Sequence, residues 1–317
     1  MPRLLIVKTS SLGDVIHNLP VIADVRAHFP DMRLDWVVEE SFTDIPALHP
    51  AVSSVIPVAM RRWRRNLLSP ATWREISAFR KRLAERPYDF ILDTQGLVKS
   101  ALIARCAHGI RHGQDRNSAR EPLASLVYQQ KHAVPRGQHA VTRNRQLAAL
   151  ALGYPMPDSP PDYGIQAPPL APGVKLPLPY VVGLHATSRA SKLWPIGHWV
   201  ALGQQLSARG LYLLLPWGSE SEFKRALTIA AAVPQVMVLP RMRLSELASI
   251  LAGARAAIGV DTGLVHLAVA LGVPAVAIYT DTDPALTGVC AGSGHAVNLG
   301  GIGQISDVPA VLDALKI

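Results

Sequence analysis

Cysteine is nearly absent from the chain. Only Cys106 and Cys290 occur among its 317 residues. Two thiols so far apart in the sequence cannot build a disulfide framework or a cysteine-rich zinc site. We expect both thiols to be buried and reduced.

Long apolar runs are also absent. Hydrophobic residues make up 49% and charged residues 17% of the chain, which is typical of a globular protein. No stretch reaches the roughly 18 to 20 apolar residues that cross a bilayer. The short apolar run at 4–7 is followed at once by Lys8, Ser10 and Asp14, which is not a secretory pattern. These features predict a cytoplasmic protein.

Acidic residues are the minority among the charges, with 23 Asp and Glu against 32 Lys and Arg and a formal net charge of +9. Such a chain attracts polyanions, whether nucleic acid, an anionic membrane face or a phosphorylated substrate. Charge alone does not choose among these partners.

Short β-rich runs alternate with longer stretches of helical apolar spacing, which predicts an α/β protein with parallel sheets covered by helices on both faces. The strands predicted in the first half are 4–8, 34–39, 54–58 and 90–93, and the helices are 15–28, 73–85, 97–107 and 140–151. In the second half the strands are 180–185, 211–215, 236–239, 256–260 and 275–279, and the helices are 196–208, 220–232, 245–252 and 264–271.

The stretch 155–179 is dense in proline and has no periodicity, which predicts a linker. We therefore expect a first Rossmann-like domain over 1–165, a linker over 166–179 and a second Rossmann-like domain over 180–317. Ligands of doubly wound sheets bind at the carboxyl ends of the strands. We expect the two domains to face each other across a cleft with chemistry in those loops.

The first predicted strand leads into Thr-Ser-Ser-Leu-Gly-Asp at 9–14 and then into a helix. Small residues there allow a ligand to approach the backbone. The loop has neither the dinucleotide-binding Gly-x-Gly-x-x-Gly pattern nor a Walker phosphate loop, which argues against an NAD enzyme and an NTPase. Asp14 is a candidate general base in this position. The alternative is that Asp14 caps the helix.

Two loops of the second half have the composition of a phosphate site. After the strand ending at His185 come Thr187, Ser188 and Lys192, whose hydroxyls and ammonium suit a departing diphosphate. The alternative is a solvated loop with local turns. The strand 256–260 runs into Asp261, Thr262 and Gly263 at the start of a helix, where backbone N–H groups and the helix dipole favour an anion. His266 lies one turn into this helix, and we favour a functional role for it over a structural one.

Three further features are ambiguous. Glu222 is placed to accept hydrogen bonds from sugar hydroxyls, or is a surface glutamate. The block Arg61, Arg62, Trp63, Arg64, Arg65 on a predicted loop suits phosphates or merely aids solubility, and Lys99 and Arg120 are candidates to extend it. Asp281 and Asp283 form an Asp-x-Asp pattern that suits a divalent metal, but Pro284 equally suits a capped turn, which we favour.

Together these stretches resemble the lipopolysaccharide heptosyltransferase family, glycosyltransferase family 9, over nearly the whole chain. The stretches that carry the resemblance are 7–15, 35–40, 61–64, 95–101, 119–125, 185–187, 192 with 194–195, 215–218, 260–264 and 266–267. Two departures stand out. The segment 279–284 reads Tyr-Thr-Asp-Thr-Asp-Pro instead of Tyr-Gly-Pro-Thr-Asp-Pro, and Ser188 stands where Thr is common.

The resemblance implies a GT-B fold and an inverting transfer of heptose from ADP-heptose to a Kdo hydroxyl of Kdo2-lipid A, without a metal or other cofactor. The basic block and a lipid acceptor together predict that this cytoplasmic protein makes peripheral contact with the anionic inner-membrane leaflet, and we expect no nucleic-acid partner. Asp14 and Lys192 are the implied catalytic residues. The implied donor-binding residues are Thr187, Ser188, Lys192, Glu222, Met242, Asp261, Thr262, Gly263 and His266. The implied acceptor-binding residues are Lys8, Ser11, Arg61, Arg62, Arg64 and Arg120.

Three alternatives compete with this prediction. A related heptosyltransferase would use the same donor on a later core acceptor. A nucleic-acid-binding protein would use the basic block, but the chain has one arginine cluster and no known binding module. A nucleotide-sugar epimerase would normally carry a dinucleotide fingerprint after its first strand.

Overall fold

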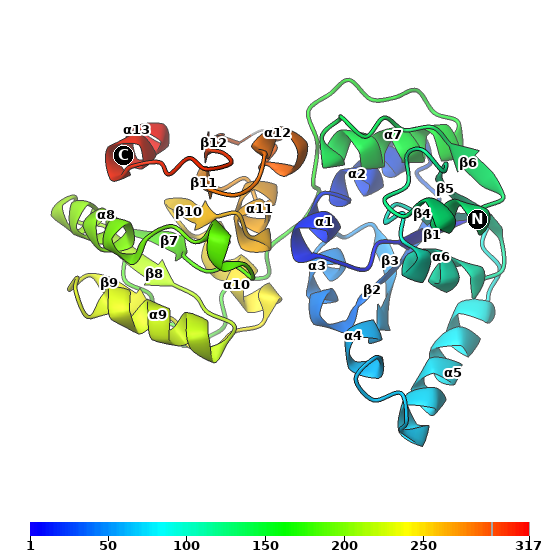
Figure 1. Cartoon of the computed structure of the whole chain (residues 1–317), viewed down its shortest axis with the longest axis horizontal. Helices are drawn as coiled ribbons and strands as arrows, with labels where there is room; N and C mark the ends of the chain where they lie inside the picture. Colours follow the sequence, from blue (N-terminus) through cyan, green and yellow to red (C-terminus); the bar gives the residue numbers. More distant parts are fainter. Residues whose placement is uncertain (293, 317) are drawn as a thin grey trace. The chain divides into compact units, whose positions relative to one another are not determined.

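The computed structural model describes residues 1–292 and 294–316. It divides into two compact units, Met1–Gly164 and Ile165–Ile317 (Figure 1). Each unit is built around one parallel six-stranded sheet.

Unit 1 has the strand order β3-β2-β1-β4-β5-β6. Its strands are β1 Arg3–Val7, β2 Arg33–Glu39, β3 Val52–Val58, β4 Phe90–Asp93, β5 Ile110–Gln114 and β6 Gln130–His132. Its helices are α1 Leu12–Ile16, α2 Leu19–His28, α3 Asp44–Ala47, α4 Met60–Trp63, α5 Pro70–Ala84, α6 Val98–Arg105 and α7 Ala140–Leu152, with 3-10 turns η1 Glu40–Phe42 and η2 Pro122–Leu126. The order reverses direction between β1 and β4, which makes that position the switch point where doubly wound sheets bind ligands.

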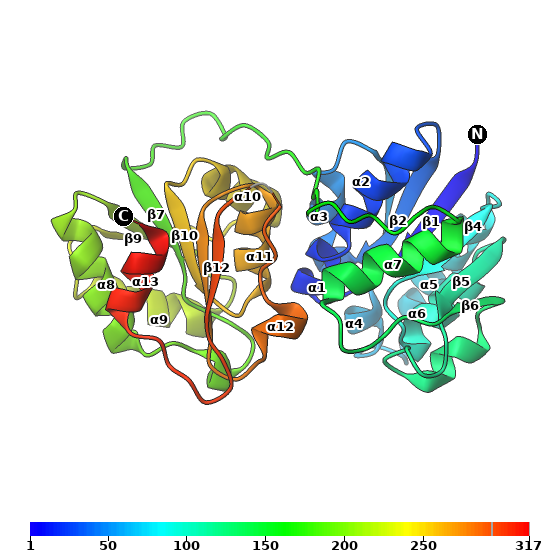
Figure 2. The same cartoon turned by 90° about the horizontal axis from the view of Figure 1, so that it is seen from above.

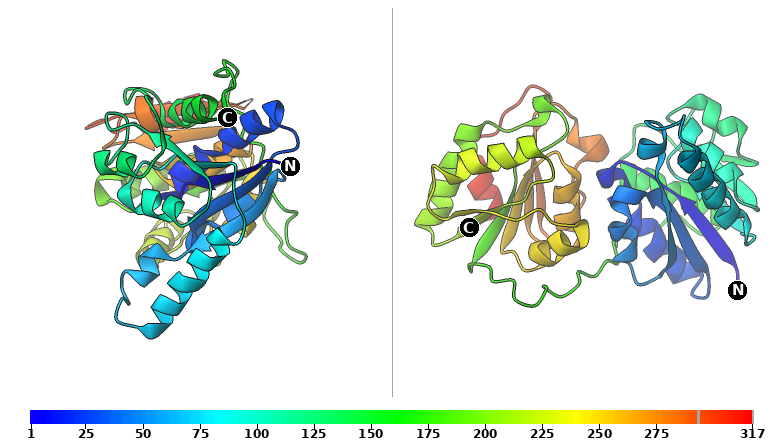
Figure 3. Two further views of the ribbon diagram at one scale, coloured as in Figure 1. Left: turned by 90° about the vertical axis from the view of Figure 1, so that its right-hand side faces the viewer. Right: turned by 90° about the horizontal axis from the view of Figure 1, so that it is seen from below.

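Helices cover both faces of this sheet. Phe79 and Leu83 of α5 and Ile103 of α6 pack against the buried strand residues Leu5 and Ile91 on one face. Helices α2 and α7 lie side by side over the other face (Figure 2). The turn from α4 into α5 projects beyond the body of the unit (Figure 3, left).

Two predictions for unit 1 were wrong in detail. The helix predicted over 15–28 is broken into α1 and α2, with Asn18 as the N-cap of the second helix. Pro20 explains the break, since its ring clashes with the carbonyl four residues earlier and it has no N–H to donate. The arginine block predicted as a loop begins as the short helix α4, in which Trp63 is buried.

Unit 2 has the strand order β12-β11-β10-β7-β8-β9, so its switch point lies between β7 and β10. Its strands are β7 Tyr180–Leu184, β8 Tyr212–Leu215, β9 Val236–Val238, β10 Ala256–Val260, β11 Ala275–Tyr279 and β12 Ala296–Gly300. Its helices are α8 Ile196–Ala208, α9 Glu220–Ala230, α10 Leu244–Ala252, α11 Gly263–Ala270, α12 Pro284–Thr287 and α13 Val308–Leu315, with the 3-10 turn η3 Ala190–Lys192.

The core of unit 2 is aromatic and aliphatic. Trp194 and Trp199 are fully buried and pack edge to face, with ring centroids 5.2 Å apart. They pack with Leu202 and Leu206 of α8 against Ile258 of β10. The predicted α/β class with two Rossmann-like sheets is confirmed.

Two other expectations concern the surface. No helix in the described part of the chain is long and apolar enough to span a membrane. Neither Cys106 nor Cys290 is in a disulfide, as expected, but both are half-buried rather than buried. Cys106 lies just past the end of α6, where its thiol donates to the Leu102 carbonyl and its side chain packs at the margin of the core.

Candidate active site

The switch point of unit 1 gathers polar side chains from the ends of β1 and β4. Lys8 follows β1 directly and is 6% exposed, and its Nζ donates to the Thr94 carbonyl at 2.9 Å. Burial lowers the pKa of Lys8 below its usual range, while the charges of Asp14 and Asp93 act to raise it. The buried Lys8 side chain therefore lies at this edge of the sheet within the electrostatic influence of Asp14 and Asp93.

A buried carboxylate organises the loop after β4. Asp93 is fully buried and accepts hydrogen bonds from the N–H groups of Gln95 at 2.9 Å and Gly96 at 3.3 Å, and from the Tyr128 hydroxyl at 2.8 Å. Burial raises the pKa of Asp93, against the effect of these donors. The Gln95 side chain then accepts from the N–H groups of Thr9 and Ser10 at 3.0 and 3.2 Å. Asp93 and Gln95 thus fix the loop that leads to Asp14.

Asp14 lies in the first turn of α1 and is half-exposed. Its Oδ2 accepts from the backbone N–H of Ser11 at 2.8 Å and from the Ser11 hydroxyl at 3.0 Å. The N-cap residue is Ser11 and not Asp14, so the predicted N-cap role of Asp14 is corrected to that of the capping partner three residues on. Only Oδ2 is used in these bonds, which leaves Oδ1 as a potential proton acceptor.

The predicted acceptor arginines differ in what they already contact. Arg62 is paired with two carboxylates, Glu75 at 2.8 Å and Glu40 at 3.0 Å. Arg61 lies over the ring of Phe42 at 5.2 Å, and Arg64 is exposed. Arg62 is therefore committed to holding η1, α4 and α5 together.

Arg120 is exposed and lies in the loop after β5, close enough to lower the pKa of Lys8 by charge repulsion. Gly96 makes this approach possible. It has φ +66°, and a Cβ there would lie 2.8 Å from the Gln114 side chain and 3.3 Å from the Arg120 nitrogen. The structure thus brings Arg120 to the same edge as Lys8 and Ser11. Lys99 also reaches this edge, where its Nζ donates to the Ser10 hydroxyl at 3.3 Å.

In unit 2 the loops after β7, β10 and β11 meet at Asp261. Its Oδ2 accepts from Lys192 Nζ at 2.6 Å and from the Thr282 hydroxyl at 2.6 Å, and its carbonyl accepts from the Thr187 hydroxyl at 2.9 Å. The Lys192 and Asp261 side chains are 17% and 12% exposed. The cluster holds one ammonium at the switch point with two N–H bonds left to donate.

Helix α11 begins at this cluster. Thr262 is its N-cap residue, no side chain caps this end within the described chain, and Gly263 is the first helical residue. The first N–H groups of a helix have no intrahelical acceptor, so they favour an anion here. His266 is 5% exposed on the same helix, and Ser188 is exposed in the loop after β7.

The predicted donor residues Glu222 and Met242 follow β8 and β9. Glu222 Oε2 accepts from the N–H groups of Gly218 at 2.7 Å and Ser219 at 3.1 Å, which makes Glu222 the capping partner of α9. Met242 is half-buried in the loop before α10. Glu222 keeps its Oε1 for a further hydrogen bond.

The Asp-x-Asp pattern is divided between two structural tasks. Asp283 caps α12 by accepting from the Ala285 N–H at 2.9 Å, and Asp281 accepts from the Ser191 hydroxyl at 2.6 Å. The favoured capped turn is present. No cluster of three His, Cys, Asp or Glu suited to a metal occurs among residues 1–292 and 294–316.

Sequence reasoning missed the buried partners behind both sites. Asp93 and Tyr128 lie 35 residues apart, and Thr282 meets Asp261 across 21 residues. The available signal for Asp93 was the polar run Asp-Thr-Gln-Gly at the end of a buried apolar strand.

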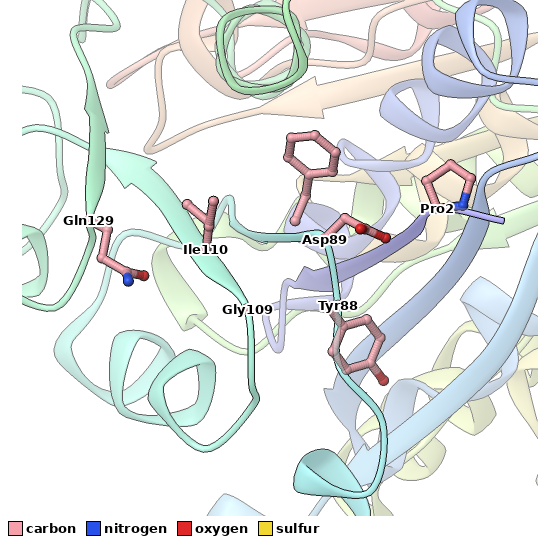
Figure 4. A pocket seen from close by; sticks show the side chains of 7 residues that line it. Pro2, Tyr88, Asp89, Gly109, Ile110 and Gln129 are labelled. Atoms are coloured by element: carbon pink, nitrogen blue, oxygen red, sulfur yellow. The ribbon is translucent and has the colours of Figure 1, made fainter.

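A pocket of about 510 Å³ lies at the opposite edge of the unit 1 sheet, where the strands begin (Figure 4). It is lined by Pro2, Tyr88, Asp89, Phe90, Gly109, Ile110 and Gln129. None of the predicted site residues lines it.

Two doubly wound units of this kind are the Rossmann-like domains of the GT-B fold. A model of glycosyltransferase family 9 (heptosyltransferase) matches residues 76–307. The chain belongs to this family.

Individual proteins agree with this result. Lipopolysaccharide heptosyltransferase 1 of Pseudomonas aeruginosa is 50% identical, over 90% of this chain and 81% of its own length. The solved structure of E. coli heptosyltransferase WaaC with ADP has a TM-score of 0.91 and 44% identity over 99% of both chains. The same protein with ADP-2-deoxy-2-fluoro heptose has a TM-score of 0.87 and 43% identity, again over 99% of both chains. The resemblance to lipopolysaccharide heptosyltransferases is confirmed, and the chain is a glycosyltransferase.

Proposed function

We propose that the protein transfers a heptose from ADP-heptose to a Kdo hydroxyl of Kdo2-lipid A, with inversion and without a metal. The observation that carries the proposal is the Lys192–Asp261 cluster beside the start of α11. It offers an ammonium and free N–H groups at the switch point of unit 2, as a departing diphosphate requires. The similarity to lipopolysaccharide heptosyltransferase 1 supports lipopolysaccharide as the acceptor class, and the similarity to WaaC, solved with ADP-2-deoxy-2-fluoro heptose, supports the choice of donor.

The donor residues divide into direct and supporting roles. Lys192 and the N–H groups of Gly263 and the following residue bind the diphosphate, with Ser188 and His266 beside them. Thr187, Asp261 and Thr262 shape this cradle, since the Thr187 hydroxyl and the Asp261 carboxylate already bond within it. Glu222 Oε1 and Met242 contact the nucleoside or sugar.

The acceptor residues lie in unit 1. Arg120, Arg61 and Arg64 are exposed and offer guanidinium groups to acidic groups of the acceptor. Lys8, Ser11 and Arg62 already donate to protein atoms. Lys8 and Arg62 therefore add positive potential, and Ser11 orients Asp14.

The reaction is a direct displacement at the anomeric carbon. The acceptor hydroxyl attacks from the face opposite the diphosphate and passes its proton to Asp14 as the new C–O bond forms. The bond to the diphosphate oxygen breaks, and ADP leaves with the electron pair. Lys192 and the helix N–H groups stabilise that charge, the task that a divalent metal performs in other glycosyltransferases. Asp281 and Asp283 take no part because Ser191 and α12 already engage them.

A lipid acceptor also implies a place of action. We propose that the enzyme works on the cytoplasmic face of the inner membrane, with the exposed arginines of α4 and the following turn attracted to anionic headgroups.

A transfer assay tests the function. The purified protein is incubated with ADP-heptose and either Kdo2-lipid A or already heptosylated core, each with and without EDTA. We expect transfer to Kdo2-lipid A alone, unchanged by EDTA. Transfer only to heptosylated core would identify a later-acting heptosyltransferase, and loss of transfer in EDTA would overturn the metal-free mechanism.

A further inference from the structure

Large apolar side chains stand exposed at the turn between α4 and α5. Leu68 is 100% exposed, Leu67 is 51% exposed and Trp73 is 58% exposed. Exposed apolar groups gathered at one place mark an interaction surface, whereas single ones do not. We call these three residues the apolar tip.

The apolar tip is held in place rather than free. The Trp73 Nε1 donates to the Leu67 carbonyl at 2.8 Å, so the indole folds over the turn. Below it, Glu75 accepts from Arg62 and from Trp63 Nε1, both at 2.8 Å. Figures 1 and 3 show this turn projecting from the body of unit 1. The apolar tip therefore lies on the part of unit 1 that projects outward, the turn from α4 into α5.

The charges around the apolar tip are of one sign. Residues 61–74 contain five arginines, Arg61, Arg62, Arg64, Arg65 and Arg74, and no acidic residue. Glu40 and Glu75 pair with Arg62, and within the described chain Arg64, Arg65 and Arg74 form no ion pair. An anionic bilayer surface has acyl chains beneath a layer of lipid phosphates. The apolar tip and the unpaired arginines around it match these two layers.

We propose that the apolar tip inserts into the interface of an anionic lipid bilayer while Arg64, Arg65 and Arg74 contact the lipid phosphates. The inference deepens the proposed function, on which it rests for the presence of a lipid acceptor at such a surface. It assigns the membrane contact to insertion of Leu67, Leu68 and Trp73, beyond the attraction of charges. A protein partner for the apolar tip would need an apolar recess of matching shape with an acidic rim. An anionic bilayer offers an apolar interior and negative charge without any matching shape.

Vesicle binding tests the insertion. Wild-type protein and the double variant Leu67→Ser, Leu68→Ser are floated with vesicles of phosphatidylcholine and phosphatidylglycerol. The control is Leu150→Ser, Leu227→Ser, which removes two leucines of 47% and 46% exposure elsewhere. We expect the tip variant to lose at least about tenfold in vesicle partition and the control to match the wild type. Melting temperatures are measured for all three proteins, to show that each is folded at the temperature of the flotation experiment.

Depth is measured separately with brominated lipid, which quenches tryptophan fluorescence. We expect quenching in the wild type and its loss in Trp73→Phe, which keeps the apolar contact and still floats. Flotation of the tip variant equal to wild type, or no quenching in the wild type, overturns the proposal. Concentration-dependent self-association that the tip variant abolishes would also overturn it, in favour of a contact between copies of the chain.

Two acceptors distinguish a failure of membrane insertion from a failure of the proposed function. Transfer to a Kdo acceptor without acyl chains should be equal in the wild type and the tip variant, while transfer to vesicle-embedded Kdo2-lipid A should fall in the variant. A wild type that floats but transfers heptose to neither acceptor refutes the function and leaves the membrane contact standing.

Discussion

Lys192 and Asp261 form a 2.6 Å ion pair between loops that are 69 residues apart in the chain. The carboxylate is held by Thr282 as well, so it fixes the direction of the ammonium. A cation oriented before the donor binds can stabilise charge on a leaving diphosphate without reorganisation. This geometry supports the proposed role of Lys192 in stabilising the leaving diphosphate.

Replacing Lys192 by Ala should lower kcat by about 100- to 1000-fold, the typical cost of removing one charge-stabilising group. Lys192→Arg should recover part of the lost kcat, because arginine keeps the positive charge but carries it on a planar guanidinium group. Steady-state kinetics with ADP-heptose measure the effect. A Lys192→Ala enzyme within threefold of the wild-type kcat would remove this residue from the mechanism.

Gln95→Ala should lower kcat by about tenfold or more while the Kd for ADP stays unchanged. The Gln95 side chain accepts from Thr9 and Ser10, so its loss loosens the loop before Asp14, and small misplacements of a catalytic group are costly. Gln129→Ala is the matched control, because Gln129 also accepts from a backbone N–H but on the strand-start side of the sheet. Equal kinetics in the two variants would contradict a positioning role for Gln95.

Stability should fall in mild acid because of His185. Burial, followed by the charge of Arg225, lowers the pKa of His185 to about 4 from the usual 6.5. Between these pH values the unfolded chain binds a proton at residue 185 and the folded chain does not. The contribution of neutral His185 to the free energy of unfolding is therefore fully present above pH 6.5 and is lost as the pH falls toward 4. It amounts to about 2 kcal/mol between pH 8 and pH 5.

Urea unfolding followed by tryptophan fluorescence at pH 8 and pH 5 measures this effect. His185→Asn should be less stable than the wild type at pH 8. Its free energy of unfolding should fall less than that of the wild type between pH 8 and pH 5, by about 2 kcal/mol. An identical pH dependence in both proteins would show that His185 does not remain neutral in the fold.

The sequence predicts best where apolar runs are buried on both faces. The strands at 90–93, 256–260 and 275–279 and the helix at 196–208 have the predicted bounds. The strands that the sequence did not predict are β5, β6 and β12, which read Ile-Arg-His-Gly-Gln, Gln-Lys-His and Ala-Val-Asn-Leu-Gly. β6 and β12 are edge strands, and their side chains are exposed or half-buried, so they give little apolar signal.

The sequence indicates candidate site residues but not the residues that they contact. Asp14, Lys192 and Asp261 are candidates because they follow strand ends, where parallel sheets bind ligands. No local pattern predicts that Asp261 bonds Lys192 and Thr282, or that Arg62 is taken up by Glu40 and Glu75, since these contacts depend on tertiary packing. The capping bonds of Asp14 and Glu222, by contrast, follow the Ser-x-x-Asp and Ser-x-x-Glu spacing at 11–14 and 219–222.

The proposed transfer requires Asp14 as the base. Asp14→Ala and Ser11→Ala both remove the Ser11–Asp14 side-chain bond, but only the first removes the carboxylate. Heptose transfer to Kdo2-lipid A, measured together with the Kd for ADP, should show no turnover for Asp14→Ala and unchanged ADP binding in both variants. Ser11→Ala should keep reduced but measurable turnover, because the Ser11 backbone N–H still donates to Asp14. Near-normal turnover by Asp14→Ala would contradict the account.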